Sequence, residues 1–327
     1  MNQRPLGKNG FNISEVGLGC WQLGSDWGEG IEKEKAFAIL QQAVDSGITF
    51  FDTADVYGGG KSETLIGAFF QQNKTPVKIT TKYGRTADVY PNNYTEDSLR
   101  KAVEASLKRL QMDCLDLIQL HCIPMEALKS GEIFDALRKL KEEGLIAHFG
   151  ASVESVEQGL VCLEQEGLQS LQIIYNIFRQ KLTTDLLPQA QAKGVGLIVR
   201  LPLASGLLTG KFTQETTFHE SDHRNYNRDG QAFNVGETFA GLPFEKGVEL
   251  AQQLEGMRPK GTNMVQMALR WILDHEAVST IIPGASLPRQ VAQNAAISDL
   301  ESLSPSLMTK LTDFYQTHVQ DHIRGVY

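Results

Sequence analysis

Four side chains with acid–base character stand at or just after the ends of three successive apolar runs: Asp52, Tyr57, Lys82 and His121. A free tyrosine has a pKa of about 10, and a neighbouring ammonium stabilises its phenolate and lowers that value. Lys82 suits this role beside Tyr57, and Asp52 would pair with a buried ammonium. His121 would donate a hydrogen bond to a substrate carbonyl and orient it. The set predicts protonation of a carbonyl oxygen while hydride reaches its carbon.

The apolar runs are spaced as strands that alternate with helices. Several are apolar on consecutive residues, as strands covered on both faces require. Because sites on parallel sheets lie beyond the carboxyl ends of the strands, the four side chains would meet at one edge. The eight runs are residues 15–21, 48–54, 77–82, 115–121, 147–152, 171–176, 196–203 and 279–285.

The segments between the runs have helical spacing of apolar residues. In the first of them Ala36, Ile39, Leu40 and Ala43 share one face, and Gly47 follows as a stop signal. In another, Ser155 with Gln158 three residues later resembles a capping box. The clearest predicted helices are residues 32–46, 95–110, 133–143 and 155–166.

Eight strand–helix units in about 300 residues predict a closed (β/α)8 TIM barrel in the α/β class, with right-handed crossovers. A doubly wound sheet would carry a glycine-rich turn after its first strand. Gly17, Gly19 and Gly24 lack the G-x-G-x-x-G spacing and open no helix. We therefore expect one barrel domain over residues 1–327.

Two additions to a bare barrel are expected. Residues 4–11 resemble a hairpin with Asn9-Gly10 at its turn, placed to cap the bottom of the barrel. Residues 213–242 form a long, polar, glycine-rich loop after the seventh strand. Loops of such length in compact domains are usually functional or mobile.

The composition excludes several classes of protein. The 327 residues carry 31 Lys and Arg against 39 Asp and Glu, a net charge of −8, with 41% hydrophobic and 21% charged residues. This acidic balance argues against binding to duplex nucleic acid or to anionic membranes. The first residues lack the apolar core of a signal peptide, and no window reaches a membrane span. The four cysteines form no C-x-x-C pair, which predicts reduced thiols and a cytoplasmic location.

Longer motifs now extend the four-residue pattern. They are GLGCW (17–21), FFDTADVYGGGKSE (50–63), TKYG (81–84), LDLIQLH (115–121), HFGAS (148–152), YN (175–176), PLASGLLTGKF (202–212) and IIPGA (281–285). With them the sequence resembles the aldo-keto reductase superfamily over nearly its whole length. The resemblance implies a nicotinamide cofactor, Asp52, Tyr57, Lys82 and His121 as catalytic tetrad, and Tyr57 as general acid. It also implies reduction of small aldehydes or ketones with NADPH.

The resemblance further implies where cofactor and substrate bind. Ser152 and Gln172 match the residues that hydrogen-bond the nicotinamide carboxamide, and Trp21 matches a residue of the substrate pocket beside Tyr57 and His121. The run at 204–211 would lie along the pyrophosphate, and the end of the eighth strand with the following helix would hold the adenosine phosphate. The cofactor residues expected from these two segments are Leu203, Ser205, Gly206, Lys211, Gly284, Ser286, Gln290 and Asn294.

Three departures from the family pattern qualify these expectations. Val153 follows Ser152 where many members have Asn, so one carboxamide contact is missing. Arg200 stands where many members have a Tyr stacked on the nicotinamide; a guanidinium also stacks on rings, but its charge disfavours the oxidised ring. Residues 284–286 are uncharged where NADPH-preferring members carry a cation, and Arg289 is the nearest substitute. NADP is therefore predicted, with NAD as the alternative.

Other interpretations stay open at this stage. His219 and His223 have ligand spacing, but they lie in a predicted loop and no metal site is expected. The basic stretch 222–230 would either close over cofactor phosphates or lie in solvent. Two rival functions are a cofactor-binding regulatory subunit, as in potassium-channel β subunits, and a lyase that forms a Schiff base on Lys82. Neither the substrate nor an oligomeric state is predicted by the sequence.

Overall fold

The computed structural model describes residues 1–24 and 31–327, and within them eight parallel strands form one sheet in the order β10-β9-β8-β7-β6-β5-β4-β3. Parallel bridges from Val16 to Ile281 and from Gly19 to Gly284 join its two edges and close the predicted barrel. The strands are β3 (Leu18–Gly19), β4 (Phe50–Asp52), β5 (Lys78–Tyr83), β6 (Leu117–His121), β7 (Phe149–Ser152), β8 (Leu168–Ile174), β9 (Gly196–Arg200) and β10 (Val278–Ile281).

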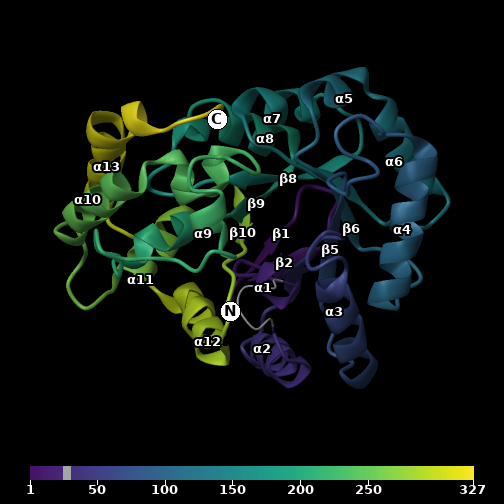
Figure 1. The fold of residues 1–327 in the computed structure, drawn as a ribbon, viewed down its shortest axis with the longest axis horizontal. Helices are drawn as coiled ribbons and strands as arrows, with labels where there is room; N and C mark the ends of the chain where they lie inside the picture. The colour runs from purple at the N-terminus through teal and green to yellow at the C-terminus, as the bar shows by residue number, and fades with distance from the viewer. Residues whose placement is uncertain (25–30) are drawn as a thin grey trace.

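Helices surround the strands on all sides (Figure 1). The longer helices bury apolar residues along one face, as a barrel requires. The described helices are α1 (Trp21–Gly24), α2 (Lys33–Asp45), α3 (Lys61–Gln72), α4 (Glu96–Leu110), α5 (Met125–Ser130), α6 (Glu132–Glu142), α7 (Val156–Leu163), α8 (Leu186–Lys193), α9 (His223–Tyr226), α10 (Phe244–Glu255), α11 (Met264–Leu273), α12 (Pro288–Ala295) and α13 (Pro305–Phe314).

Helix α4 shows how local sequence sets these boundaries. Its N-cap Thr95 accepts a hydrogen bond from the backbone N–H of Ser98, and the Ser98 hydroxyl accepts one from the backbone N–H of Thr95. This reciprocal box satisfies two backbone donors that a helix start leaves open. The buried residues Leu99, Val103 and Leu107 lie on one face, as their spacing predicts.

The predicted N-terminal hairpin is confirmed. Strands β1 (Gln3–Pro5) and β2 (Asn12–Ser14) pair antiparallel, and the backbone N–H of Leu6 donates to the carbonyl of Phe11 across the loop. The loop covers residues 6–11 and contains Asn9-Gly10, as expected, and its left-handed residue is Gly7, with φ of +72°. A Cβ on Gly7 would lie 2.3 Å from the Gln169 amide, which explains the glycine.

The hairpin closes the amino-terminal end of the barrel. The Gln169 amide of β8 donates to the carbonyl of Leu6, and Arg4 donates to the carbonyl of Val278 at the start of β10. Above the hairpin an apolar plug fills the barrel floor, formed by Leu6, Ile13, Phe50, Leu117, Ile198 and Ile282. A rigid floor leaves the opposite end of the barrel for binding.

Several element boundaries differ from the sequence-based expectation; β3 covers only Leu18–Gly19 of the predicted 15–21, and β9 ends at Arg200 rather than at 203. Strand β8 begins at Leu168, three residues before the predicted run, because polar Gln169 and Ser170 interrupt the apolar pattern although both are buried. Helix α7 ends at Leu163, three residues early. Its cap Ser155 accepts from the backbone N–H of Gln158, whereas the Gln158 side chain accepts from the backbone N–H of Glu154.

The long segment after β9 contains more side-chain packing than its polar composition predicts. It contains α9 and the 3-10 turn η3 (Val235–Glu237). An aromatic cluster ties it to α10, with ring centroids of Phe218 and Phe239 at 5.5 and 5.0 Å from Phe244. The segment is therefore packed against the main hydrophobic core of the barrel. Separately, no helix in residues 1–24 or 31–327 has the length and apolar character needed to span a membrane.

Candidate active site

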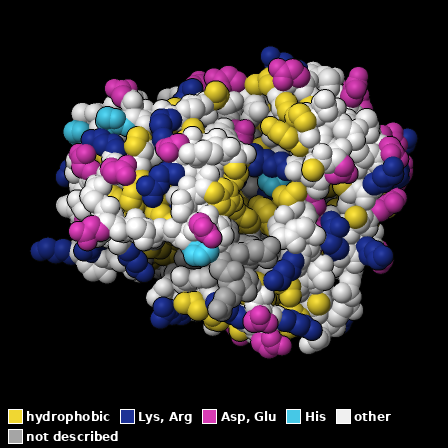
Figure 2. Space-filling view, in the orientation of Figure 1, with side chains coloured by type: hydrophobic (Ala, Val, Ile, Leu, Met, Phe, Trp, Pro, Cys, Tyr) yellow, Lys and Arg dark blue, Asp and Glu magenta, His cyan; other side chains and the backbone are white. Residues whose placement is uncertain are grey.

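A cavity of about 850 Å³ opens where the carboxyl ends of the barrel strands meet the loops that follow them. Figure 2 shows hydrophobic side chains gathered around a hollow near the middle of this face, with basic and histidine side chains visible inside it. The volume is in the range of sites for drug-sized ligands and cofactors. Three of the four predicted catalytic side chains, Asp52, Tyr57 and His121, line it, and Lys82 lies directly beneath.

Lys82 is the centre of the predicted catalytic group. Its Nζ donates to Asp52 Oδ1 at 2.5 Å, to the carbonyl of Thr53 at 2.8 Å and to the Tyr57 hydroxyl at 3.2 Å. Lys82 is 1% exposed and Asp52 is 2% exposed. The ring of His121 lies 6.1 Å from that of Tyr57, edge to face. The strand ends thus bring all four residues together, as the sequence predicts.

The charge states of this group follow from burial and from these contacts. Burial disfavours the Lys82 ammonium, but Asp52 and Tyr57 outweigh it and raise the pKa of Lys82. Burial and the nearby Arg85 and Lys82 lower the pKa of His121 well below its usual value, so His121 is neutral near pH 7. A lysine held as an ammonium is a poor nucleophile, which argues against a Schiff base on Lys82.

Tyr57 corrects one expectation. Lys82 does lower the pKa of the Tyr57 hydroxyl, but burial is the larger effect and Asp52 adds to it, so the net pKa is raised rather than lowered. Tyr57 therefore keeps its proton at neutral pH. A general acid must be protonated before reaction, and Lys82 then stabilises the phenolate that forms.

The second oxygen of Asp52 is held from across the barrel. Gln172 of β8 donates from Nε2 to Asp52 Oδ2 at 2.6 Å, and Gln119 of β6 donates to the same oxygen at 3.4 Å. The hydroxyl of Ser152 donates to the Gln172 carbonyl oxygen at 3.4 Å. Ser152 and Gln172, the two predicted carboxamide ligands, are thus neighbours of the catalytic group and are bonded to each other.

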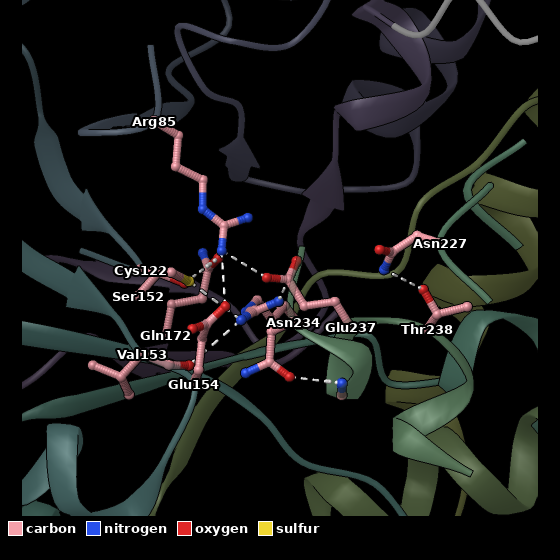
Figure 3. A network of polar contacts seen from close by, with 12 residues as sticks. Arg85, Cys122, Ser152, Val153, Glu154, Gln172, Asn227, Asn234, Glu237 and Thr238 are labelled. Carbon is pink, nitrogen blue, oxygen red and sulfur yellow. Dashed lines mark hydrogen bonds and ion pairs between the residues drawn. The ribbon is translucent and has the colours of Figure 1, made fainter. Parts of the chain in front are cut away.

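Arg200 is paired with a carboxylate at the cavity mouth. Its Nη1 lies 3.2 Å from Glu237 Oε2, and its Nη2 lies 3.4 Å from the sulfur of Cys122. Arg85 donates from Nη2 to Glu154 and to Glu237, each at 2.8 Å (Figure 3). We call Arg85, Glu154, Arg200 and Glu237 the mouth network. It joins the loops after β5, β7 and β9.

The two glutamates of the mouth network differ in their acidity. Burial opposes ionisation of Glu237, yet Arg200 and Arg85 hold the pKa of its carboxyl well below the usual range. Burial and the neighbouring Glu237 raise the pKa of Glu154. Sequence reasoning missed both glutamates because they lie in loops rather than at strand ends. The replacement of a family tyrosine by Arg200 was the available signal that a counter-charge lies nearby.

One group of described side chains has the spacing of metal ligands. Cys122, Glu154 and Glu237 place potential ligand atoms within 4.8 Å of one another, the one such group of described residues. Arg85 and Arg200 already donate to these carboxylates and to the sulfur, so guanidinium groups take the place of a cation. His219 bonds to Ser221, and the ring of His223 packs 4.7 Å from Trp21.

Comparisons with known proteins agree with this geometry. The Aldo/keto reductase family matches residues 15–316 of the chain. The chain belongs to that family. It is 30% identical to L-galactose dehydrogenase from Arabidopsis thaliana, over 92% of this chain and 89% of that protein. It is also 30% identical to a putative voltage-gated potassium channel subunit beta from Schizosaccharomyces pombe, over 95% and 92% of the two chains.

A solved structure shares the whole fold. The glycerol dehydrogenase from Gluconobacter oxydans superposes with a TM-score of 0.81 at 28% identity, over 99% of this chain and 98% of that one. As an aldo-keto reductase with eight closed parallel strands, the chain is an oxidoreductase of a family that uses nicotinamide cofactors and acts on small carbonyl compounds. The individual roles of its residues are proposed below.

The cavity suits a nicotinamide dinucleotide by its charge. Lys35, Lys82, Arg85, Arg200 and Arg224 line or underlie it, against three acidic residues, although the whole chain is acidic. Of the expected cofactor residues, most line the cavity and three do not. Gln172, Arg200, Leu203, Ser205, Gly206, Gly284, Ser286 and Gln290 are in its wall; Ser152, Lys211 and Asn294 are outside it. Lys211 and Arg289 are exposed.

Two backbone features of this aldo-keto reductase lie in the expected cofactor region. Leu201, Ala204 and Ser205 all have positive φ between 49° and 55°, and Gly206 follows at 101°. Such strain in non-glycine residues is concentrated at functional sites. At the start of α12, the side-chain oxygen Oε1 of Gln290 accepts from the backbone N–H groups of Ser286 and Leu287. An anion at that helix start would have to displace this contact.

Proposed function

We propose that this chain reduces an aldehyde or ketone to the alcohol with NADPH, with NADH as the alternative hydride donor, and that Tyr57 is the general acid. The observation that carries the proposal is the position of Lys82 Nζ, which contacts both Asp52 and the Tyr57 hydroxyl beside a neutral His121. We further propose that residues 1–327 act as one domain and work in the cytoplasm; none of the four cysteines is in a disulfide.

The hydride and the proton of the proposed reduction each have a source and a destination. When bound, the reduced nicotinamide supplies a hydride, which carries two electrons to the carbonyl carbon. The Tyr57 O–H bond breaks and its proton passes to the carbonyl oxygen, and Lys82 stabilises the phenolate that remains. Neutral His121 donates an N–H to the same oxygen and orients it. Solvent returns the proton to Tyr57, and the reverse sequence oxidises the alcohol.

The cofactor roles are assigned by resemblance to the family, and most of these residues also lie in the cavity wall. Ser152 and Gln172 would bind the carboxamide, Arg200 would stack on the ring, and Leu203, Ser205 and Gly206 would follow the pyrophosphate. Lys211 would approach the phosphates from outside the wall. Gly284, Ser286, Gln290 and Asn294 would hold the adenosine end, with Arg289 as a candidate contact for the 2′-phosphate of NADP.

The substrate pocket would be formed around Trp21. Its ring lies 6.3 Å from that of Tyr57, and both line the cavity. The names of two relatives, L-galactose dehydrogenase and glycerol dehydrogenase, suggest small polyhydroxylated substrates. A second candidate function rests on the similarity to the potassium channel β subunit, namely cofactor binding in the service of a partner with little turnover.

The test is nicotinamide oxidation by the purified chain, with NADPH and NADH in parallel, against a panel of small aldehydes and ketones. Tyr57→Phe is the paired control, with cofactor binding measured separately by fluorescence. Turnover that disappears in the variant while cofactor binding persists supports the reductase. Tight cofactor binding without turnover on any substrate would favour the regulatory subunit.

A further inference from the structure

We propose that Arg85 forms a subsite for a neutral oxygen on the carbon next to the reacting carbonyl, so that α-hydroxyaldehydes and α-hydroxyketones are preferred over alkyl carbonyls and over 2-oxoacids. The inference rests on the proposed reductase function and specifies its substrate class. Neither the tetrad nor the cofactor residues assign a role to Arg85.

Arg85 is close to the reaction centre. It follows β5 three residues after Lys82 and lines the same cavity as Tyr57 and His121. Of the charges around His121, that of Arg85 has the largest effect on the imidazole. Because β5 and β6 are paired, Arg85 and His121 leave neighbouring strand ends, so Arg85 lies at the substrate end of the cavity rather than at the adenosine end of a cofactor.

The guanidinium of Arg85 is only partly used by the protein. Of its five N–H donors, the two on Nη2 bond to Glu154 and Glu237, and in Figure 3 the dashed lines from Arg85 leave that one nitrogen. No described residue accepts from Nε or Nη1. The side chain is 20% exposed, into the cavity. These donors require an acceptor, which is water in the free protein and a substrate oxygen in the complex.

Charge decides which oxygen fits. Arg85 donates to both Glu154 and Glu237, and Arg200 pairs with Glu237, so glutamate carboxyl groups already occupy positions that a substrate carboxylate would need. A substrate carboxylate beside Arg85 would also meet the two glutamates bonded to the same nitrogen. A hydroxyl accepts a hydrogen bond from Arg85 and donates one to a glutamate oxygen, so both the guanidinium and the carboxylate gain a partner. An ethyl group does neither and leaves the donors without a partner.

The experiment compares glycolaldehyde with propanal, which differ by a hydroxyl in place of a methyl group, and adds glyoxylate as the carboxylate. The variant is R85M/E154Q, which removes one charge of each sign and leaves the Arg200–Glu237 pair. We expect the ratio of kcat/KM for glycolaldehyde to that for propanal to fall at least about tenfold, as for a lost hydrogen bond to a charged group. The single variant E154Q removes one candidate acceptor and should lower the ratio less than the double variant does, whereas K78M, which removes an exposed cation of the same strand outside the cavity, should keep the ratio within twofold.

A second variant tests the inference if R85M/E154Q does not fold. Arg85→Lys keeps a cation between the two glutamates but lacks the Nε and Nη1 donors, and it should lower the ratio in the same direction. An equal loss for glycolaldehyde and propanal would overturn the inference and leave the reductase intact. A larger loss for glyoxylate than for glycolaldehyde would also overturn it, because Arg85 would then be an anion site. Absence of Tyr57-dependent turnover in the unaltered protein would remove the proposed function itself.

Discussion

Gln172 donates a 2.6 Å hydrogen bond to Asp52 across the barrel, from β8 to the strand on its opposite side. Because Lys82 occupies Oδ1 of the same carboxylate and Gln172 occupies Oδ2, both oxygens of Asp52 are fixed. A fixed carboxylate fixes the ammonium, and the ammonium faces the Tyr57 hydroxyl. A glutamine that the family resemblance assigns to cofactor binding is thus also part of the support of the general acid.

Gln172→Leu tests this support. The change leaves Asp52 Oδ2 with the longer bond from Gln119, and an unsatisfied buried carboxylate oxygen costs about 1–3 kcal/mol of unfolding free energy. We expect that loss in denaturant unfolding, with kcat/KM for an aldehyde lowered by roughly tenfold or more. Gln119→Leu is the control, since toward Asp52 it removes only the 3.4 Å bond, together with a 3.1 Å bond to the Thr80 hydroxyl. Equal effects of the two variants would mean that the 2.6 Å contact has no special role.

Because the Lys82–Asp52 pair is buried, we expect removal of one partner to destabilise the protein more than removal of both. Lys82→Met leaves a buried carboxylate without its cation and should cost roughly 3–5 kcal/mol of stability. The double variant D52N/K82M removes both charges and should recover most of that loss while remaining inactive. Thermal and denaturant unfolding together with single-turnover kinetics measure the two effects.

The same strand offers the control for that comparison. Lys78 at the start of β5 pairs with Asp116 at 2.7 Å, but its side chain is 44% exposed. Lys78→Met should cost only about 0–1 kcal/mol, as partly exposed pairs do. If K78M and K82M destabilised the protein equally, burial would not be the reason for the strength of the Lys82–Asp52 pair.

The sequence predicts the barrel and the tetrad for a physical reason. Asp52, Lys82 and His121 end apolar runs, and parallel strands bring their carboxyl ends to one place. The mouth network has no such rule, because Glu154 and Glu237 are separated by 83 positions and lie in irregular loops. The net pKa of Tyr57 was equally beyond reach, since it depends on how far burial outweighs the visible lysine.

Asp55 predicts a pH-dependent stability. Burial and the nearby Glu63 raise the pKa of its carboxyl to about 7, above the model-peptide value of 3.8. The folded protein therefore favours the protonated form. The wild type loses stability from this group as pH rises from about 4 to 7, and the penalty is constant above that.

Asp55→Asn removes the titration and should stabilise the protein more at pH 8 than at pH 5. An increase of roughly 1–3 kcal/mol in the free energy of unfolding at pH 8 is expected. Denaturant titrations of both proteins at the two pH values check it. A gain of the same size at both pH values would show that Asp55 titrates with an ordinary pKa.

Glu237→Gln tests whether the pairing of Arg200 matters for the cofactor. The oxidised nicotinamide ring is positive and the reduced ring is neutral, so an unpaired guanidinium against the ring disfavours NADP⁺ selectively. We expect the ratio of Kd for NADP⁺ to Kd for NADPH to rise about tenfold, equivalent to about 1.4 kcal/mol. The double variant R200Q/E237Q removes both charges and should return the ratio toward that of the wild type. An unchanged ratio in E237Q would show that Arg200 does not face the nicotinamide ring.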